Sequence, residues 1–406
     1  MRIIHTADWH LGKRLYEQDL IPDQRLFLEW LLAYIRSEAI ELLLVSGDIF
    51  DHANPSSEAR ALYFQFLAKL SEINCKAIIT GGNHDSPAVL NGPKSLLNSF
   101  GFHVVGALPE NPADAIFSFN DAHTNSEVVV LAVPYLRESD LRTPTANLTA
   151  EERIHAMREG IAQTYQHLSR EAAIRYPGAT ILAMGHLYAA GSTISDSERE
   201  IQIGNLAAVG TDAFPRNLKY VALGHLHRPQ EVGGNSRIRY SGSPISLSFS
   251  EHEDRKEIVR IDTEERIVYV KPVQIPTFRT LIRASGSLQE LEAAFRPVLP
   301  SIYRLPAWAE AELVLEKSNP IEISAFEQWV NQFQHQHLQI IRHRVKLKNE
   351  EQNLRWTEDP GMRLEDLQPI DVFRKRLDQT SLSVEDRLAL EQTFRDLLQE
   401  TLEDEE

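Results

Sequence analysis

Five short segments place metal-binding residue types directly after apolar, strand-like runs. They are Asp8-Trp9-His10, Gly47-Asp48, Asn83-His84-Asp85, Gly185-His186 and Gly224-His225-Leu226-His227. Carboxylate, amide and imidazole groups are costly to bury without partners, and a divalent metal ion satisfies several of them at once. Ligand sites of open α/β sheets form beyond the carboxyl ends of the strands. One such segment is weak evidence, but five in succession predict a metal centre at a strand-end rim.

Strand-like and helical patterns alternate from the N-terminus to about residue 270. Short apolar runs, each followed by a turn, predict strands at 42–46, 77–80, 128–132, 180–184 and 220–223. Amphipathic stretches predict helices at 24–35 and 57–70, and a hairpin is expected from the runs at 257–262 and 266–270. Together these elements predict an α/β domain at 1–276.

Three smaller regions follow that domain. A small α+β capping domain is predicted at 277–348, with strands at 279–283, 311–316 and 339–345 and helices at 287–295 and 323–334. A polar linker is expected at 349–362, and a C-terminal helical segment at 363–406. The apolar faces of its two helices, at 370–377 and 384–402, are too small to form a core alone, so they must dock on this chain or on another. Those faces include Phe373, Leu377, Leu388, Phe394 and Leu398.

Composition limits the class of protein. The 406 residues are 42% apolar and 25% charged, as in soluble globular proteins. The single cysteine, Cys75, excludes an intramolecular disulfide and a cysteine-based zinc ribbon, and it favours a reducing, cytoplasmic setting. No apolar run reaches the ~18 residues of a membrane span, and the chain opens into a strand-like run instead of a signal peptide.

The formal net charge of -16 bears on nucleic-acid binding. Proteins that bind nucleic acid alone usually carry a basic footprint, because neutralising phosphates supplies much of the affinity. If this chain acts on nucleic acid, a metal centre, a local basic patch or a partner must supply positive charge. Arg342, Arg344, Lys346 and Lys348 form one basic stripe that either steers DNA or is an ordinary charged strand face.

The order of these motifs resembles the calcineurin-like metallophosphoesterases. Within them, ADWHLGK at 7–13, SGDIFD at 46–51, GNHDS at 82–86 and YSGSPI at 240–245 are similar to the bacterial SbcD family of nuclease subunits. The resemblance implies a four-layer α/β/β/α sandwich that holds two divalent metal ions. It also implies that these ions are Mn²⁺. It assigns Asp8, His10, Asp48 and His227 to one ion and Asp48, Asn83, His186 and His225 to the other, with Asp48 as the bridge.

The same resemblance assigns roles next to the ligands. His84 is expected to protonate or stabilise the leaving 3′ oxygen, and Asp85 either orients His84 or braces the turn. Gly81 and Gly82 are expected to permit a sharp turn. Lys13 and Arg14 either contact substrate phosphate or lie in a solvated loop. Two further residues have structural readings: Asp51 is expected to brace the site without binding metal, and His5 to be packed.

The implied function is that of a metal-dependent DNA nuclease. The family combines 3′ to 5′ double-strand exonuclease and single-strand or hairpin endonuclease activity. It is the catalytic subunit of an ATP-dependent complex with an SbcC-type ATPase, which processes DNA ends and hairpins in repair, recombination and replication. A homodimer through the nuclease domain, nucleoid association and partner docking through the C-terminal helices are implied as well.

Two alternatives stay open. One is another dinuclear metallophosphoesterase, a nucleotide phosphodiesterase or a phosphoprotein phosphatase. Against the phosphatase, the segment 47–52 lacks an Arg-Gly pair after Asp51, and Asp85 stands where glutamate is expected. The other is a non-catalytic scaffold, which is disfavoured because no expected ligand is missing.

Overall fold

The computed structural model divides into two compact units, Met1–Leu315 with Asn319–Lys346 and Glu316–Ser318 with Leu347–Glu406. Residues are described at 1–121, 126–141, 148–193, 208–264, 267–296, 304–335, 337–348, 370, 373–374, 377, 387 and 390–394. The expected linker at 349–362 therefore lies outside the described residues. The expected boundary between nuclease and capping domains falls inside the first unit.

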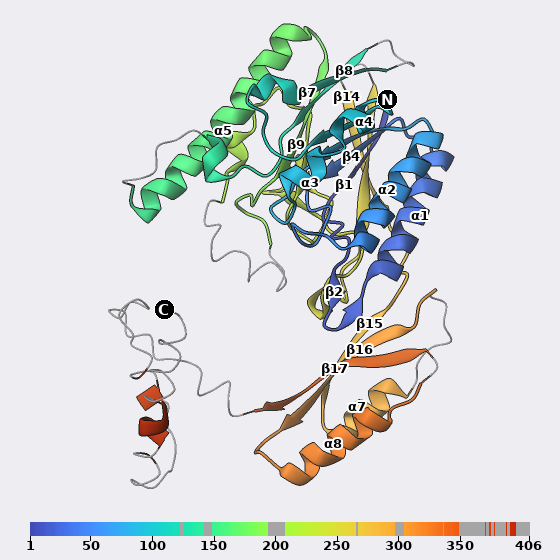
Figure 1. The fold of residues 1–406 in the computed structure, drawn as a ribbon, viewed down its shortest axis with the longest axis vertical. Coiled ribbons are helices and arrows are strands. Elements are labelled where there is room, and N and C mark those ends of the chain that lie inside the picture. The colour runs from blue at the N-terminus through green and yellow to red at the C-terminus, as the bar shows by residue number, and fades with distance from the viewer. Residues whose placement is uncertain are drawn as a thin grey trace. The chain divides into compact units, whose positions relative to one another are not determined.

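Two six-stranded sheets form most of the first unit (Figure 1). The first sheet has the spatial order β14 (Ile267–Gln274), β13 (Glu257–Glu264), β1 (Arg2–Thr6), β4 (Leu42–Ser46), β5 (Lys76–Thr80) and β6 (Phe102–Val105). The second has the order β11 (Gln230–Val232), β12 (Asn235–Tyr240), β10 (Tyr220–Gly224), β9 (Thr180–His186), β8 (Glu127–Ala132) and β7 (Ile116–Asn120). All the strands predicted in this part of the chain are present, within a few residues at their ends.

Helices cover the outer faces of both sheets, as Figure 1 shows. α1 (Ile21–Ser37) and α2 (Ser57–Glu72) pack on the first sheet, and α5 (Ala150–Arg175) packs on the second. A separate apolar cluster, with Leu44 and Met184 among its members, fills the space between the sheets. Strands covered on both faces are apolar along their whole length, which explains the uninterrupted apolar runs. The four-layer α/β/β/α sandwich is thereby confirmed.

Local sequence signals define the helix starts. Ser56 caps α2 through its side chain, and Thr149 with Glu152 forms a capping box at α5. Two short helices, α3 (Pro87–Asn91) and α4 (Lys94–Asn98), follow β5. The hairpin of β2 (Arg14–Leu15) and β3 (Gln18–Asp19) lies between β1 and α1 in the sequence.

A three-stranded sheet forms the region expected to be the cap. It has the order β15 (Leu281–Gly286), β16 (Ala307–Leu315) and β17 (Leu338–Leu347), with α7 (Leu288–Phe295) and α8 (Pro320–Gln332). Arg279 ties this region to α1, because it pairs with the buried Asp23 at 2.9 Å while its guanidinium lies 3.7 Å from the Trp308 ring centre.

The basic stripe lies on β17 and is largely paired. Arg342 lies 3.0 Å from Glu310, Arg344 pairs with Glu312, and both acidic residues are on the neighbouring strand β16. Opposite charges on adjacent strands offset one another, so this pattern matches the ordinary charged strand face.

In the second unit, Phe373 and Phe394 stack with ring centres 4.0 Å apart, and Leu377 is buried. The described residues around them are helical, as predicted. Leu388 and Leu398 lie outside the described residues. In the described part of the chain, no helix combines the length and apolar character that crossing a membrane requires.

Candidate metal centre

The strand registers bring the five chemical segments to one edge. Thr6 of β1 pairs with Val45 of β4, and Ser46 of β4 pairs with Thr80 of β5, so the segments after these parallel strands leave side by side. In the second sheet, His186 at the end of β9 pairs with Gly224 of β10. The two sheets meet where the His225 N–H donates to Asp8 Oδ1 at 2.9 Å. All seven expected metal ligands therefore converge, although 219 sequence positions separate the first from the last (227 minus 8).

Four of the seven expected ligand residues adopt left-handed backbone conformations. Their φ angles are 54° for Asp8, 44° for His10, 50° for Asp48 and 103° for His225. Such conformations cost roughly 1–3 kcal/mol each in residues other than glycine and concentrate at functional sites. These unfavourable backbone conformations direct the four side chains toward one place, which is evidence for a functional site.

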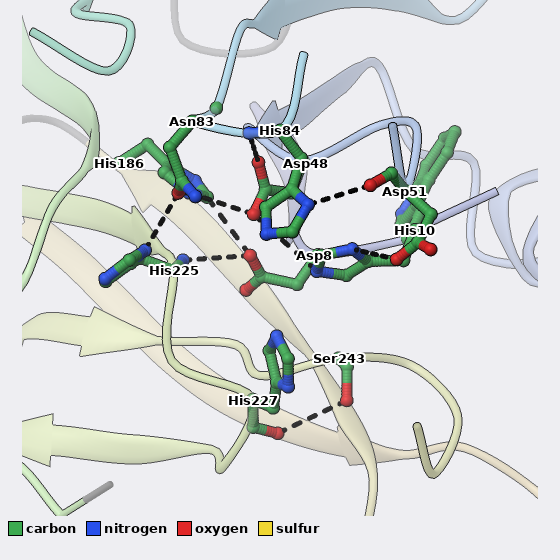
Figure 2. Close-up of polar contacts among 12 residues, drawn as sticks. Asp8, His10, Asp48, Asp51, Asn83, His84, His186, His225, His227 and Ser243 are labelled. Atoms are coloured by element: carbon green, nitrogen blue, oxygen red, sulfur yellow. Dashed lines mark hydrogen bonds and ion pairs between the residues drawn. The ribbon is translucent and has the colours of Figure 1, made fainter. Parts of the chain in front are cut away.

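Asp8, His10 and His227 form the first ligand group, in which one ligand atom of each lies within 4.8 Å of the others (Figure 2). Asp8 Oδ2 and His10 Nε2 are buried and have no hydrogen-bond partner within the described chain. A buried acceptor without a partner is unfavourable unless something else, such as a cation, satisfies it. The residues therefore fit a bound divalent ion.

The second group gathers around Asn83. Asn83 Oδ1 lies 3.0 Å from His186 Nε2 and 3.0 Å from His225 Nδ1. One oxygen of Asp48 connects the groups, because Oδ2 lies 3.6 Å from His10 Nε2 and 3.3 Å from His186 Nε2. A carboxylate oxygen between two imidazoles is well placed to bridge two cations.

Outer contacts orient two of the imidazoles. His10 Nδ1 donates to Asp51 Oδ1 at 3.1 Å, and His186 Nδ1 donates to the Ser46 carbonyl at 2.9 Å. Each contact engages Nδ1 and leaves Nε2 facing the cluster, where it can bind a metal ion once it is unprotonated. Asp51 also accepts from Lys13 Nζ at 3.0 Å, so it braces the site as expected.

Burial sets the protonation of the cluster. It lowers the pKa of His10 to about 4 and that of His225 to about 3, so both rings are neutral and able to bind a metal ion. Burial and the nearby Asp48 carboxylate raise the pKa of Asp8 to about 7, against the opposing His186. For His186 burial is the largest single effect and lowers the pKa, but the Asp48 and Asp8 carboxylates and the Ser46 carbonyl together outweigh it and raise the pKa to about 9. In the protein without metal, protons thus occupy places that a cation would take.

His84 and Asp85, although adjacent in sequence, have different hydrogen-bond partners. His84 Nδ1 donates to the Asp51 carbonyl at 2.8 Å, and the His84 N–H donates to Asp48 Oδ1 at 3.0 Å. The Asp85 carboxylate instead accepts from the backbone N–H groups of Ile49, Phe50 and Gly82. Asp85 therefore braces two turns and does not orient His84. The short side chain of Asp85 reaches only these nearby backbone donors. The expected catalytic role of Asp85 is therefore replaced by a positioning role.

Gly81 and Gly82 are required for close approach and not for unusual dihedral angles, because neither has a positive φ. A Cβ on Gly82 would overlap Asp48 Oδ1 and the Asp48 backbone nitrogen, and one on Gly81 would overlap the Gly106 carbonyl. The glycine backbone of the turn at 80–87 therefore packs directly against the Asp48 carboxylate.

The basic side chains near the metal centre differ in whether a carboxylate already pairs with them. Lys13 is held by Asp51, and Arg14 lies 3.4 Å from Asp19 with more than half of its side chain exposed. Arg137, which sequence reasoning missed, donates from its guanidinium to the Asp85 carbonyl at 3.3 Å, and among the described residues no carboxylate pairs with that guanidinium. Arg137 could have been identified from the sequence because it lies just beyond β8, which belongs to the same sheet as β9 and β10.

His5, by contrast, is packed as expected. It is fully buried, accepts from the Tyr220 hydroxyl at 2.9 Å through Nδ1 and donates to the Leu223 carbonyl at 3.2 Å through Nε2. Burial lowers its pKa to about 3.

Comparison with known proteins agrees with this geometry. The model of the calcineurin-like phosphoesterase family matches residues 1–229, and that of the type 5 capsule protein repressor C-terminal domain matches residues 277–381. A relative from Escherichia coli K12 is 32% identical over 320 residues, covering 78% of this chain and 79% of its own. One from Rhodobacter capsulatus is 38% identical over 319 residues (74% and 76%), and one from Bacillus subtilis 32% over 289 residues (70% and 70%).

The sandwich with Asp, Asn and His side chains gathered at its strand-end rim is that of a calcineurin-like phosphoesterase, and the chain belongs to that family. All three relatives are named as the SbcD component of the SbcCD nuclease. At this identity and coverage, the chain belongs to the SbcD family within the larger one.

Proposed function

We propose that this protein is a metal-dependent DNA nuclease, the catalytic subunit of an SbcCD-type complex. The names of its relatives and the convergence of seven ligands support this proposal. One observation carries it: a single Asp48 oxygen lies between His10 of one ligand group and His186 of the other. That arrangement is typical of a dinuclear phosphodiesterase site.

The proposed first ion is held by Asp8, His10, Asp48 and His227, and the second by Asp48, Asn83, His186 and His225. Mixed imidazole and oxygen ligands favour manganese, iron or zinc over magnesium alone, and we propose Mn²⁺. Two such ions, when bound, stabilise the attacking and leaving oxygens of a phosphodiester and lower the pKa of a water molecule. The chain's own part is to hold the ligand atoms with neutral imidazoles and a shared carboxylate.

His84 is the proposed acid at the leaving 3′ oxygen. Its Nδ1 is engaged by the Asp51 carbonyl, so Nε2 is the ring atom that remains for substrate. His84 Nε2 is buried and has no partner within the described residues. His10 and His84 lie edge to face with ring centres 4.9 Å apart, which places His84 against the first ligand group.

DNA phosphates next to the reacting one require positive charge on an acidic chain. Arg137 supports this role better than Lys13 or Arg14, because those two already pair with carboxylates. We propose that all three residues contact DNA phosphates and that Arg137 makes the main contact.

The partner contacts rest on the C-terminal segment. Phe373 and Phe394 stack on each other and Leu377 is buried, and we propose that the helices carrying them dock as a pair on an SbcC-type ATPase. A homodimer through the nuclease domain and a cytoplasmic, nucleoid-associated location belong to the same proposal.

The test is hydrolysis of DNA by the full chain with Mn²⁺, with and without the SbcC-type ATPase and ATP. Linear duplex and hairpin substrates are expected to be cut, and Asp48→Asn to abolish cutting. His155→Ala is the control, because that side chain is 76% exposed on α5, and it is expected to cut normally. Hydrolysis of small phosphoesters or phosphoproteins without any DNA cleavage would establish the alternative metallophosphoesterase and overturn the nuclease.

A further inference from the structure

A buried ion pair lies beside the ligand His227 and has no role in the site described so far. Glu251 ends the short 3₁₀ helix η5 (Phe249–Glu251) and is fully buried, and Lys256 is 8% exposed. Burying two charges costs several kcal/mol per ion, which only close geometry and additional hydrogen bonds offset. Apolar residues of similar size would serve stability as well, so the pair calls for another explanation.

Lys256 uses its ammonium group fully. Nζ donates to Glu251 Oε2 at 2.6 Å, to Ser243 Oγ at 2.9 Å and to the His227 carbonyl at 3.2 Å. An ammonium group has three protons, and each has an acceptor here. One of those acceptors is the backbone of the metal ligand itself, and Figure 2 shows Ser243 against the same carbonyl.

Glu251 holds the same histidine from its ring side. Oε1 of Glu251 lies 3.5 Å from His227 Nδ1, while Oε2 accepts from the Leu247 N–H at 3.1 Å and from Lys256. His10 and His186 each have an acceptor for Nδ1, namely Asp51 and the Ser46 carbonyl. Glu251 supplies the corresponding acceptor for His227.

We propose that Glu251 and Lys256 are positioning residues that fix His227 for metal binding, Glu251 through Nδ1 and Lys256 through the backbone carbonyl. An imidazole that is held at Nδ1 binds a metal ion through Nε2. The inference rests on the proposed function, since it assigns a task toward the proposed first metal ion. It also gives the motif at 240–245 a role, because Ser243 links the pair.

The test is calorimetric titration of Mn²⁺ into chelator-treated full-length protein. The double variant Glu251→Met with Lys256→Met removes both charges at similar volume, so its folding is expected to stay close to wild type. Its Mn²⁺ affinity at one of two sites is expected to fall roughly 10- to 100-fold, the usual loss when an outer partner of a ligand is removed. Glu253→Met is the matched control, because that side chain is 86% exposed, and it is expected to bind like wild type.

A folded double variant with unchanged Mn²⁺ affinity would overturn the inference, as would an equal loss in Glu253→Met. If the double variant does not fold, Glu251→Gln carries the same test, with a loss of affinity expected at one site and none contradicting the proposal. If the wild-type protein does not bind two Mn²⁺ ions, the result would instead contradict the proposed function. The two failures are thus distinguished by the wild-type titration alone.

Discussion

The Nδ1–H of His84 donates to the backbone carbonyl of Asp51 at 2.8 Å. This bond joins the turn after β5 to the loop after β4, which also carries Asp48. It fixes the ring without using a ligand atom, so a change at His84 can be separated from a change in the metal centre.

His84→Ala is expected to lower DNA cleavage by about 10² or more, because a positioned acid typically contributes that much to the rate. Binding of Mn²⁺ is expected to stay within a few fold of wild type. Cleavage assays and Mn²⁺ titration measure the two effects, with His155→Ala as the surface control. Equal losses in metal binding and cleavage would show that His84 is a ligand and not an acid.

Gly82→Ala is expected to disrupt the metal centre from the backbone side. The new methyl group would overlap the Asp48 carboxylate and backbone, and such overpacking typically costs about 1–3 kcal/mol of the free energy of unfolding. Chemical denaturation and Mn²⁺ titration measure both losses. Gly92→Ala is the control, since its backbone is helical and its nearest atom, the Ala88 carbonyl oxygen, would lie 3.2 Å away. Normal Mn²⁺ affinity in Gly82→Ala would contradict the close approach.

Affinity for Mn²⁺ is expected to fall as the pH is lowered from about 9 toward 6. The raised pKa values, about 9 for His186 and about 7 for Asp8, mean that a proton must leave each group before it binds a cation. The loss is roughly tenfold per pH unit for each proton displaced, so the dependence is expected to steepen below about pH 7. Titration in buffers of different ionisation enthalpy counts the released protons. A flat affinity over this range would disprove the raised pKa values.

His5 is expected to make the protein less stable in acid. Its pKa is lowered to about 3 in the folded state, so between about pH 6.5 and 3 the unfolded chain binds a proton that the folded chain does not. The free energy of unfolding therefore decreases as the pH is lowered through this window, by up to about 1.4 kcal/mol per pH unit. The substitution His5→Gln can keep both hydrogen bonds without titrating.

Denaturant unfolding of chelator-treated His5→Gln across this window is thus expected to show a shallower pH dependence than wild type. His155→Gln, at an exposed site, is expected to follow wild type. Identical slopes in all three proteins would mean that His5 does not carry the effect.

The α/β class and the candidate metal-binding residues could be predicted from the sequence because both depend on local order, whereas the four-layer sandwich and the division of the ligands between two ions were implied by the family resemblance. Each ligand follows an apolar run, and parallel strands bring their carboxyl ends to one edge whatever the loops between them do. Asp8, Asp48 and His186 were therefore identifiable without any contact information. The same periodicity placed the predicted helices and strands to within a few residues, whereas α5, β6 and β7 were not predicted.

The remaining assignments depended on contacts between distant segments. Asp85 and His84 are adjacent in sequence, yet their side chains bond to different partners, and only the packing of β4 beside β5 decides which. Glu251 and Lys256 carry no strand-end signature, so their place beside His227 emerges only when β10 and the 243–256 segment are folded together. Sequence order by itself determined which side chains could bind metal, whereas the tertiary structure decided how each is aimed, because hydrogen-bond partners are chosen by distance in space and not along the chain.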